Sequence, residues 1–244
     1  MRYRTLQQIQ RLLLGISVVV LISIALLVAR LAGASVPMLD RWIPQTFVRD
    51  AFAKQVVLIS GHAGYDSGAV CSDAAGQALV TEAAVNAAVA EQTAQRLRRA
   101  GADVLIVEEF DARLLGLQAD VLLSIHADSC IEASGYKAAH HTNSAIPSIE
   151  ARLVACIDHH YPRITGLAHH PNTITHDMTN YHAFRQIDPQ TPAAIIELGF
   201  LGGDQTLLVK QPDVVAQGVA ESLLCFLQEK SEPTDGLEET TNLS

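Results

Sequence analysis

Short apolar runs alternate with amphipathic stretches along most of the chain. Four runs rich in β-branched residues predict buried strands at residues 56–59, 104–107, 121–125 and 193–196. Longer stretches with apolar positions at helical spacing predict helices at residues 81–100, 149–161 and 212–228. Because short buried strands alternate with helices, we expect an α/β fold, with an open, twisted, mainly parallel sheet flanked by helices on both faces.

The longest apolar run lies near the N-terminus. Residues 12–29 contain no charge, and a helix of this length spans about 27 Å, close to the thickness of a hydrocarbon core. Arg2, Arg4 and Arg11 precede the run, which predicts a transmembrane anchor with a cytoplasmic N-terminus. A cleaved signal segment is the alternative, because Ala32-Gly33-Ala34 resembles a cleavage site. Either interpretation places the rest of the chain in the cell envelope or secreted, outside the cytoplasm.

The chain divides into four expected parts. Residues 1–34 form the cytoplasmic tip and the anchor or signal segment, and residues 35–54 form a linker with two prolines. Residues 55–228 form a single globular domain. Residues 229–244 are polar and acidic, which predicts a disordered tail.

The charge of the chain bears on its partners. Asp and Glu number 26 against 17 Lys and Arg, which gives a net charge of −9. The globular part contains no basic stripe, so a nucleic-acid partner is not expected. The predicted membrane contact is confined to residues 12–29.

Three of the predicted strands run into residues that can carry chemistry. His62 follows the first strand, His126 follows the third, and Glu197 follows the last. The carboxyl ends of parallel strands meet at one edge of a sheet, so we expect these side chains to converge there. Glu82 begins the first long helix. It either stabilises the helix dipole or faces the same edge as a fourth member of the group.

This set of residue types is typical of a catalytic zinc site. Two imidazoles and one carboxylate bind Zn²⁺ and leave a position open for water, which would use His62, His126 and Glu82. Glu197 would then remain as the base that takes a proton from the attacking water. The set fits the hydrolysis of an amide bond.

Four motifs resemble those of the zinc-dependent N-acetylmuramoyl-L-alanine amidases of the amidase_3 type. They occur in the order of that family over about residues 55–228, and they read GHAGYDSGA at 61–69, TEAAVN at 81–86, SIHADS at 124–129 and AIIELGFL at 194–201. Small departures occur at Ala63, Asp128 and Gly202-Gly203, and none of them removes an expected ligand.

The resemblance implies an enzyme with one Zn²⁺ per chain, bound by His62, Glu82 and His126, and with Glu197 as the catalytic acid and base. It also implies a cell wall hydrolase that cleaves the amide between N-acetylmuramic acid and L-alanine in peptidoglycan. A zinc peptidase acting on wall peptides and a non-catalytic wall-binding or regulatory module are the alternatives. The sequence does not identify an activating protein.

Three further residues are candidates for support of the site. Asp66 either orients His62 through a hydrogen bond or caps its own loop. His182 either lines the cleft or lies on a surface loop. Arg185 either contacts a carboxylate of the substrate or forms a surface ion pair.

The four cysteines follow the apolar run and therefore meet oxidising conditions. Cys71 and Cys130 belong to loops that leave the expected metal edge, so we expect a disulfide between them. Cys156 and Cys225 lie in apolar helical stretches, where we expect buried free thiols.

Overall fold

The computed structural model describes residues 13, 16–18, 20–22, 24 and 51–229. The few described residues near the N-terminus are helical and exposed. Within the described part of the chain, no helix is both long and apolar enough to cross a bilayer. Most of the predicted anchor, most of the predicted linker and nearly all of the predicted tail lie outside the described residues, and they stay predictions.

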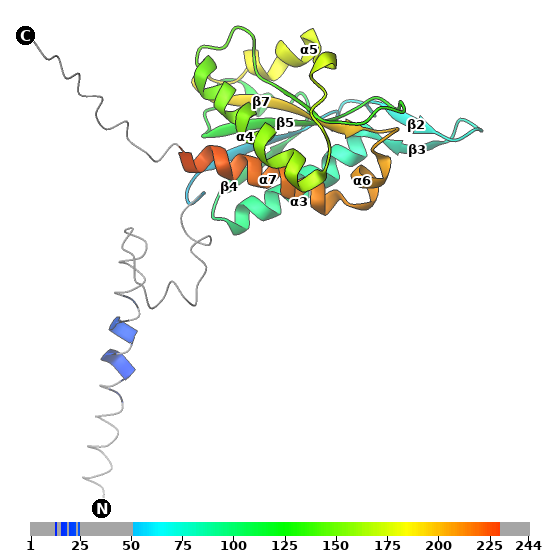
Figure 1. Ribbon diagram of the computed structural model, residues 1–244. Helices are drawn as coiled ribbons and strands as arrows, with labels where there is room; N and C mark the ends of the chain where they lie inside the picture. Colours follow the sequence, from blue (N-terminus) through cyan, green and yellow to red (C-terminus); the bar gives the residue numbers. More distant parts are fainter. Residues whose placement is uncertain (1–12, 14–15, 19, 23, 25–50, 230–244) are drawn as a thin grey trace, which may run out of the picture. The chain divides into compact units, whose positions relative to one another are not determined.

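A five-stranded sheet forms the centre of the globular domain, with the strand order β4-β1-β5-β7-β6 (Figure 1). Four strands are parallel, as predicted: β1 (Gln55–Ser60), β4 (Asp103–Val107), β5 (Val121–Asp128) and β7 (Ala193–Phe200). The short edge strand β6 (Lys137–Ala139) runs antiparallel to β7. The β5 and β7 strands continue beyond their predicted ends, so His126 and Glu197 lie within strands instead of after them.

The three long helices pack on one face of the sheet. They are α3 (Glu82–Arg99), α4 (Pro147–Thr165) and α7 (Pro212–Glu229), and the short helix α6 (Gln205–Lys210) precedes α7. Alternate strand residues such as Leu58, Leu123 and Ile196 pack against them in the larger hydrophobic core. Ala51, within the predicted linker, is also buried in this core.

The opposite face is covered by short helical segments. They are η2 (Ala112–Leu114), α5 (His176–Thr179) and η4 (His182–Arg185), and a further turn, η3 (Pro171–Thr173), lies in the same region. Met178, Tyr181 and Phe184 from these segments pack against strand residues such as Val57 and Ile195. Helical segments therefore flank both faces, as predicted, and the three long helices lie together on one of them (Figure 1).

A hairpin that the sequence did not predict connects β1 to α3. Its strands are β2 (Val70–Ser72) and β3 (Ala78–Thr81), and they pair antiparallel. The hairpin ends at Thr81, whose Oγ1 accepts a hydrogen bond from the backbone N–H of Ala84 and caps α3. The cap fixes Glu82 as the first residue of the helix.

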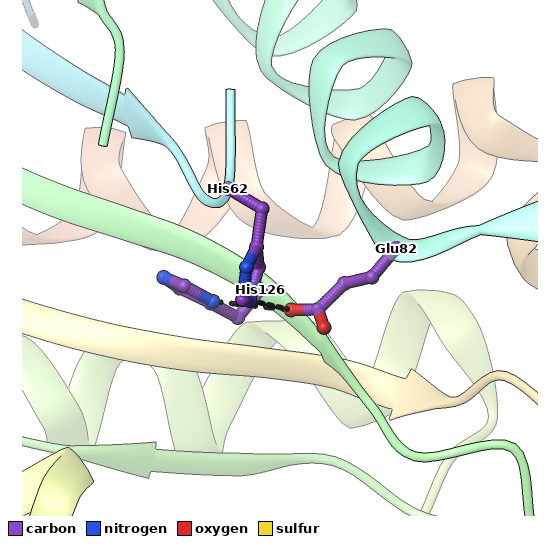
Figure 2. A group of neighbouring side chains, drawn as sticks. All are labelled: His62, Glu82 and His126. Atoms are coloured by element: carbon purple, nitrogen blue, oxygen red, sulfur yellow. Dashed lines mark hydrogen bonds and ion pairs between the residues drawn. The ribbon is translucent and has the colours of Figure 1, made fainter. Parts of the chain in front are cut away.

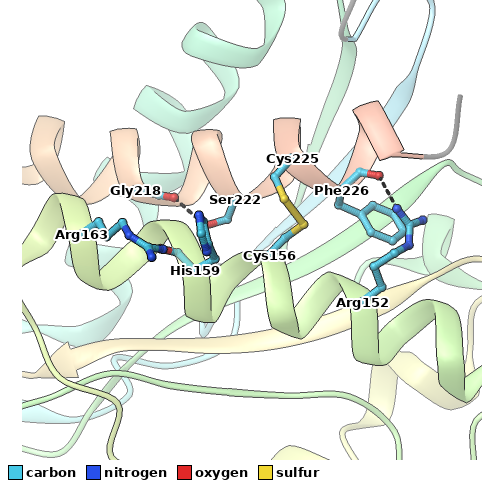
Figure 3. Close-up of a disulfide and its surroundings, with 8 residues drawn as sticks. All are labelled: Arg152, Cys156, His159, Arg163, Gly218, Ser222, Cys225 and Phe226. Atoms are coloured by element: carbon cyan, nitrogen blue, oxygen red, sulfur yellow. Dashed lines mark hydrogen bonds between the residues drawn. A yellow bond between two sulfur atoms is a disulfide. The ribbon is translucent and has the colours of Figure 1, made fainter. Parts of the chain in front are cut away.

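All four cysteines form disulfides. Cys71 and Cys130 are bonded as predicted, and their bond ties β2 to the loop that follows β5. Cys156 and Cys225 are also bonded, so the prediction of free thiols was wrong (Figure 3). Their helices, α4 and α7, pack side by side and bring the two thiols together, a contact between segments 69 residues apart that helical spacing alone does not reveal.

Polar and aromatic contacts flank the bond between α4 and α7. The Arg152 guanidinium lies over the Phe226 ring, 4.4 Å from its centroid, and donates a hydrogen bond of 3.1 Å to the Phe226 carbonyl (Figure 3). Ser222 Oγ donates to the carbonyl of Gly218 within α7. The disulfide therefore lies inside an extensive contact between the two helices.

Candidate active site

His62, Glu82 and His126 come together from three separate segments (Figure 2). Each offers one ligand atom, and these atoms lie within 4.8 Å of one another. Glu82 Oε1 lies 3.2 Å from His62 Nε2 and 3.1 Å from His126 Nδ1. Glu82 and His126 are buried, whereas His62 is partly exposed, so the group is reached from the surface at His62.

A tight turn after β1 brings His62 to this place. The residue has a φ of +66°, in the left-handed region that non-glycine residues seldom occupy. The turn is held because the N–H of Gly61 donates to the Ile125 carbonyl. A Cβ at Gly61 would lie 2.5 Å from the His126 ring, so only glycine lets the two histidines approach this closely.

The Glu82 carboxylate is fixed by several donors. The backbone N–H groups of Ala69 and Ala127 donate to its two oxygens, and Asn86 Nδ2 lies 3.4 Å from Oε1. Burial alone would raise the pKa of Glu82, but the hydrogen bonds from His126 and Ala69 outweigh burial and lower the pKa. The carboxylate is therefore ionised, as a metal ligand must be.

Glu197 is the cross-strand neighbour of His126. The two residues face each other in the register of β5 and β7, so their side chains project on the same side of the sheet. Glu197 Oε2 is buried and has no hydrogen-bond partner among the described residues. Burial raises the pKa of Glu197 to about 7.

Lys137 is the neighbour of Glu197 on the other side, in β6. Its buried ammonium forms an ion pair with Asp128 and donates a hydrogen bond to the Thr173 carbonyl. Because these groups already hold the ammonium, one carboxylate oxygen of Glu197 stays unpaired within the described part of the chain.

The family model of Amidase_3, described as N-acetylmuramoyl-L-alanine amidase, matches residues 56–224. The chain belongs to this family. The match covers nearly all of the sheet, helices α3 and α4, most of α7, and all four residues of the candidate site. It confirms the predicted enzyme class, a peptidoglycan N-acetylmuramoyl-L-alanine amidase, and such a domain acts outside the cytoplasm, where its substrate lies.

Solved structures of amidases share this fold. An N-acetylmuramoyl-L-alanine amidase from Clostridium difficile 630 is 21% identical over 74% of this chain and 100% of that chain, with a TM-score of 0.56. The catalytic domain of CwlV from Bacillus (Paenibacillus) polymyxa var. colistinus is 22% identical over 70% of this chain and 96% of that chain, with a TM-score of 0.51. The CwlD amidase from Clostridioides difficile, in complex with the GerS lipoprotein, is 16% identical over 71% of this chain and 98% of that chain, with a TM-score of 0.55. No curated protein matches the chain.

The other predicted residues of the amidase differ in how close they lie to the site. Asp66 Oδ1 lies 2.6 Å from His62 Nδ1 and also accepts the N–H of Gly68, so it contacts the site directly. His182 reaches the site through one intervening carboxylate, that of Glu109. Arg185 instead donates to the carbonyl and side-chain oxygens of Asn180, outside the group of three.

Glu109 is a residue of the candidate site that sequence reasoning missed. Its carboxylate accepts hydrogen bonds from the His62 N–H, the Tyr181 hydroxyl and His182 Nε2, all between 2.7 and 2.8 Å, and it lies 3.6 Å from His126 Nε2. Burial would raise its pKa, but the bond from His182, the charge of His126 and the remaining donors lower the pKa to about 2. A signal was present in the sequence, because Glu109 follows the predicted strand at 104–107 and so belongs to a fourth strand end.

The residues of the candidate site fit a divalent cation. Glu82 and Glu109 are buried carboxylates beside the two histidines, and Glu197 adds a third with a buried, unpaired oxygen. Lys137 is buried nearby, but it is paired with Asp128. Two imidazoles and one carboxylate within reach of one ion are a donor set that suits Zn²⁺.

Proposed function

We propose that the amidase hydrolyses the amide between the lactyl group of N-acetylmuramic acid and L-alanine with one Zn²⁺ bound by His62, Glu82 and His126. The observation that carries the proposal is the convergence of these side chains from three separate segments, with their ligand atoms within 4.8 Å. A bound Zn²⁺ would polarise the scissile carbonyl and lower the pKa of a water molecule.

Glu197 serves as the acid and base of the reaction. It takes a proton from the attacking water as the new C–O bond forms, and it gives that proton to the nitrogen of L-alanine as the C–N bond breaks. The products are the muramyl carboxylic acid and a stem peptide with a free amino group. A pKa of about 7 suits both transfers, because the group gains and loses a proton readily near neutral pH.

Asp66 and Glu109 position the two histidines. Asp66 holds Nδ1 of His62, so that Nε2 of the same ring faces Glu82. Glu109 lies near Nε2 of His126, while Nδ1 of that ring faces Glu82. Carboxylates placed in this way fix the ring orientation of histidine ligands and raise their basicity.

The apolar run near the N-terminus supports a location in the cell envelope, or secretion if the segment is cleaved. Residues 12–29 anchor the chain in the membrane, or they direct its export as a cleaved signal segment. The support is the uncharged apolar run and the arginines before it. In both cases the catalytic domain meets peptidoglycan outside the cytoplasm.

Digestion of purified peptidoglycan by the full-length chain, with and without a chelator, tests the proposal. We expect about one zinc per chain by metal analysis, loss of cleavage with the chelator and recovery when Zn²⁺ is restored. Mass analysis should find free stem peptides that begin with L-alanine. Cleavage only within the stem peptide would identify a peptidase instead, and binding to the wall without cleavage would identify a non-catalytic module.

A further inference from the structure

Two large aromatic side chains are exposed beside the candidate site. Tyr65 is 67% exposed and Phe110 is 54% exposed, and their rings pack edge to face with centroids 4.7 Å apart. The Phe110 ring also lies on His182, 4.3 Å between centroids and tilted by 32°. We call these three residues, Tyr65, Phe110 and His182, the aromatic ledge.

Tyr65 and Phe110 of the ledge lie in the loops after β1 and β4, which also carry His62 and Glu109. Tyr65 belongs to the turn that contains His62, and its N–H donates to the His62 carbonyl. Phe110 directly follows Glu109, which accepts hydrogen bonds from the His62 N–H and from His182. The ledge therefore lies at the rim of the site, next to the partly exposed His62.

A hydrogen bond fixes His182 within the ledge, and the rings of Tyr65 and Phe110 are open to solvent. The 2.8 Å hydrogen bond from His182 Nε2 to Glu109 holds the imidazole under Phe110. The Phe110 ring packs on His182 and the Tyr65 ring packs on Phe110, and both rings still expose more than half of their surface. An exposed ring that is held in place binds a flat apolar surface with little loss of side-chain entropy.

We propose that the aromatic ledge is the subsite for the N-acetylmuramyl sugar ring of the substrate. The inference rests on the proposed amidase function and names the part of the substrate that the rim recognises. A pyranose ring offers a neutral face of C–H groups that packs on an aromatic ring.

The charges around the ledge favour the sugar over the stem peptide. Asp66 is exposed next to Tyr65, and the Glu108 carboxylate lies over Gly64 on the same loop. These carboxylates repel the carboxylates of a stem peptide, whereas the sugar ring carries no charge. We expect the contact between the sugar and the ledge to be equally strong in the ground state and in the transition state, so that it lowers KM without raising kcat.

Two soluble substrates with the same scissile amide test the subsite. One is an N-acetylmuramyl peptide, and the other is a lactoyl peptide that has no sugar. For the zinc-loaded full-length chain, Phe110→Ala should raise KM for the muramyl peptide by roughly five- to tenfold and leave kcat nearly unchanged. It should leave both constants for the lactoyl peptide unchanged, and Phe110→Tyr should restore KM for the muramyl peptide.

Phe52→Ala is the matched control. Phe52 is also an exposed phenylalanine, at 64%, but it lies before the start of β1, at the opposite edge of the sheet from the site. Its replacement should not change KM for either substrate. Zinc content and melting temperature should be equal in all variants, which separates a binding effect from a folding effect.

A direct binding measurement gives the second readout. In the Glu197→Gln background, in which turnover should be greatly slowed, calorimetry should show that Phe110→Ala weakens binding of the muramyl peptide by the same factor. Binding of the lactoyl peptide should not change. Equal effects on both ligands, or no effect on either, would overturn the subsite. Failure of the wild-type chain to cleave the muramyl peptide at all would overturn the proposed function instead, so the two failures are distinguishable.

Discussion

Glu197 combines two properties that a catalytic acid and base needs. It stands next to His126 in the sheet, and one of its carboxylate oxygens is buried without a hydrogen-bond partner among the described residues. An unpaired buried oxygen destabilises the ionised form, which is why the pKa of the group rises toward neutrality. Ionised Glu197 should therefore destabilise the folded state, although the residue is necessary for the reaction.

Replacement of Glu197 by Gln should lower kcat by about 10²- to 10⁴-fold, because the amide cannot carry the proton. The zinc content should stay at about one per chain, since Gln keeps the shape of the side chain and is not a proposed ligand. Glu132→Gln, at an exposed position in the loop after β5, is the matched control and should behave as wild type. Unchanged muropeptide cleavage by the Glu197 variant would refute the assigned role.

The pKa of Glu197 also predicts how the stability of the zinc-free protein depends on pH. The pKa of Glu197 is raised from 4.5 in the unfolded chain to about 7 in the folded protein, so the native state binds the proton more tightly. Stability from this group is present below pH 4.5 and is lost as the pH rises to 7 and above. Chemical denaturation of chelated protein at pH 4.5 and pH 8 should show this loss in the wild type and a smaller loss in Glu197→Gln. An equal change in the free energy of unfolding between pH 4.5 and pH 8 in the two proteins would contradict this prediction.

Glu109 should act on metal affinity through the histidines. Glu109→Gln weakens the acceptor of three hydrogen bonds and removes the negative charge near His126. We expect the Kd for Zn²⁺ to rise by about 10- to 100-fold, as is typical when a carboxylate behind a histidine ligand is lost. Competition with a zinc-binding dye measures this without reference to activity. A Kd equal to that of the wild type would reduce Glu109 to a structural role.

At the scale of secondary structure elements, sequence patterns predicted the four parallel strands and missed the short strands β2, β3 and β6. The four parallel strands contain continuous apolar runs, and the three long helices show helical spacing. The convergence of the candidate site could be predicted because the carboxyl ends of parallel strands meet at one edge of the sheet. The strand β6 and the hairpin strands have only three or four residues each, and none of them contains a run of four apolar residues. The sequence could not indicate that β5 and β7 extend past the site, because His126 and Glu197 interrupt their apolar runs.

The partners of Glu109 were beyond sequence reasoning for a different reason. Tyr181 and His182 lie 72 and 73 residues after it, in a stretch without regular periodicity. Only the packing of the short segments on the second face of the sheet brings them to the end of β4. Likewise, each of Cys156 and Cys225 resembled an ordinary buried residue of its own helix, and only the contact between α4 and α7 pairs them.

The disulfide between α4 and α7 should stabilise the domain without affecting the metal. Cys225→Ser should lower the free energy of unfolding by about 2–4 kcal/mol, since the bond closes a long loop of the unfolded chain. Zinc affinity and KM should not change, because α4 and α7 contribute none of the proposed ligands. Denaturant unfolding and zinc titration measure the two effects separately. A variant that unfolds at the wild-type denaturant concentration would show that the bond contributes nothing.

At the scale of the whole molecule, the bound cation should contribute to stability. The buried carboxylates of Glu82, Glu109 and Glu197 repel one another, and a divalent cation among them removes that repulsion. With free Zn²⁺ about 1,000-fold above its Kd, binding to the folded state alone adds about 4 kcal/mol. The melting temperature should therefore fall on chelation and recover with Zn²⁺, but not with Mg²⁺, which binds poorly to imidazole. Equal melting temperatures with and without chelator would argue against a site that binds the ion in the folded state.

The pairing of β5 with β7 has a consequence for how the enzyme works. His126, a proposed ligand, and Glu197, the proposed proton carrier, are adjacent residues of two hydrogen-bonded strands. The distance between them is therefore set during folding and not when substrate arrives. Catalysis of this kind needs no lid to close over the substrate before the chemistry begins. The turnover rate should therefore be insensitive to solvent viscosity, and amide hydrogens along both strands should exchange among the slowest in the protein.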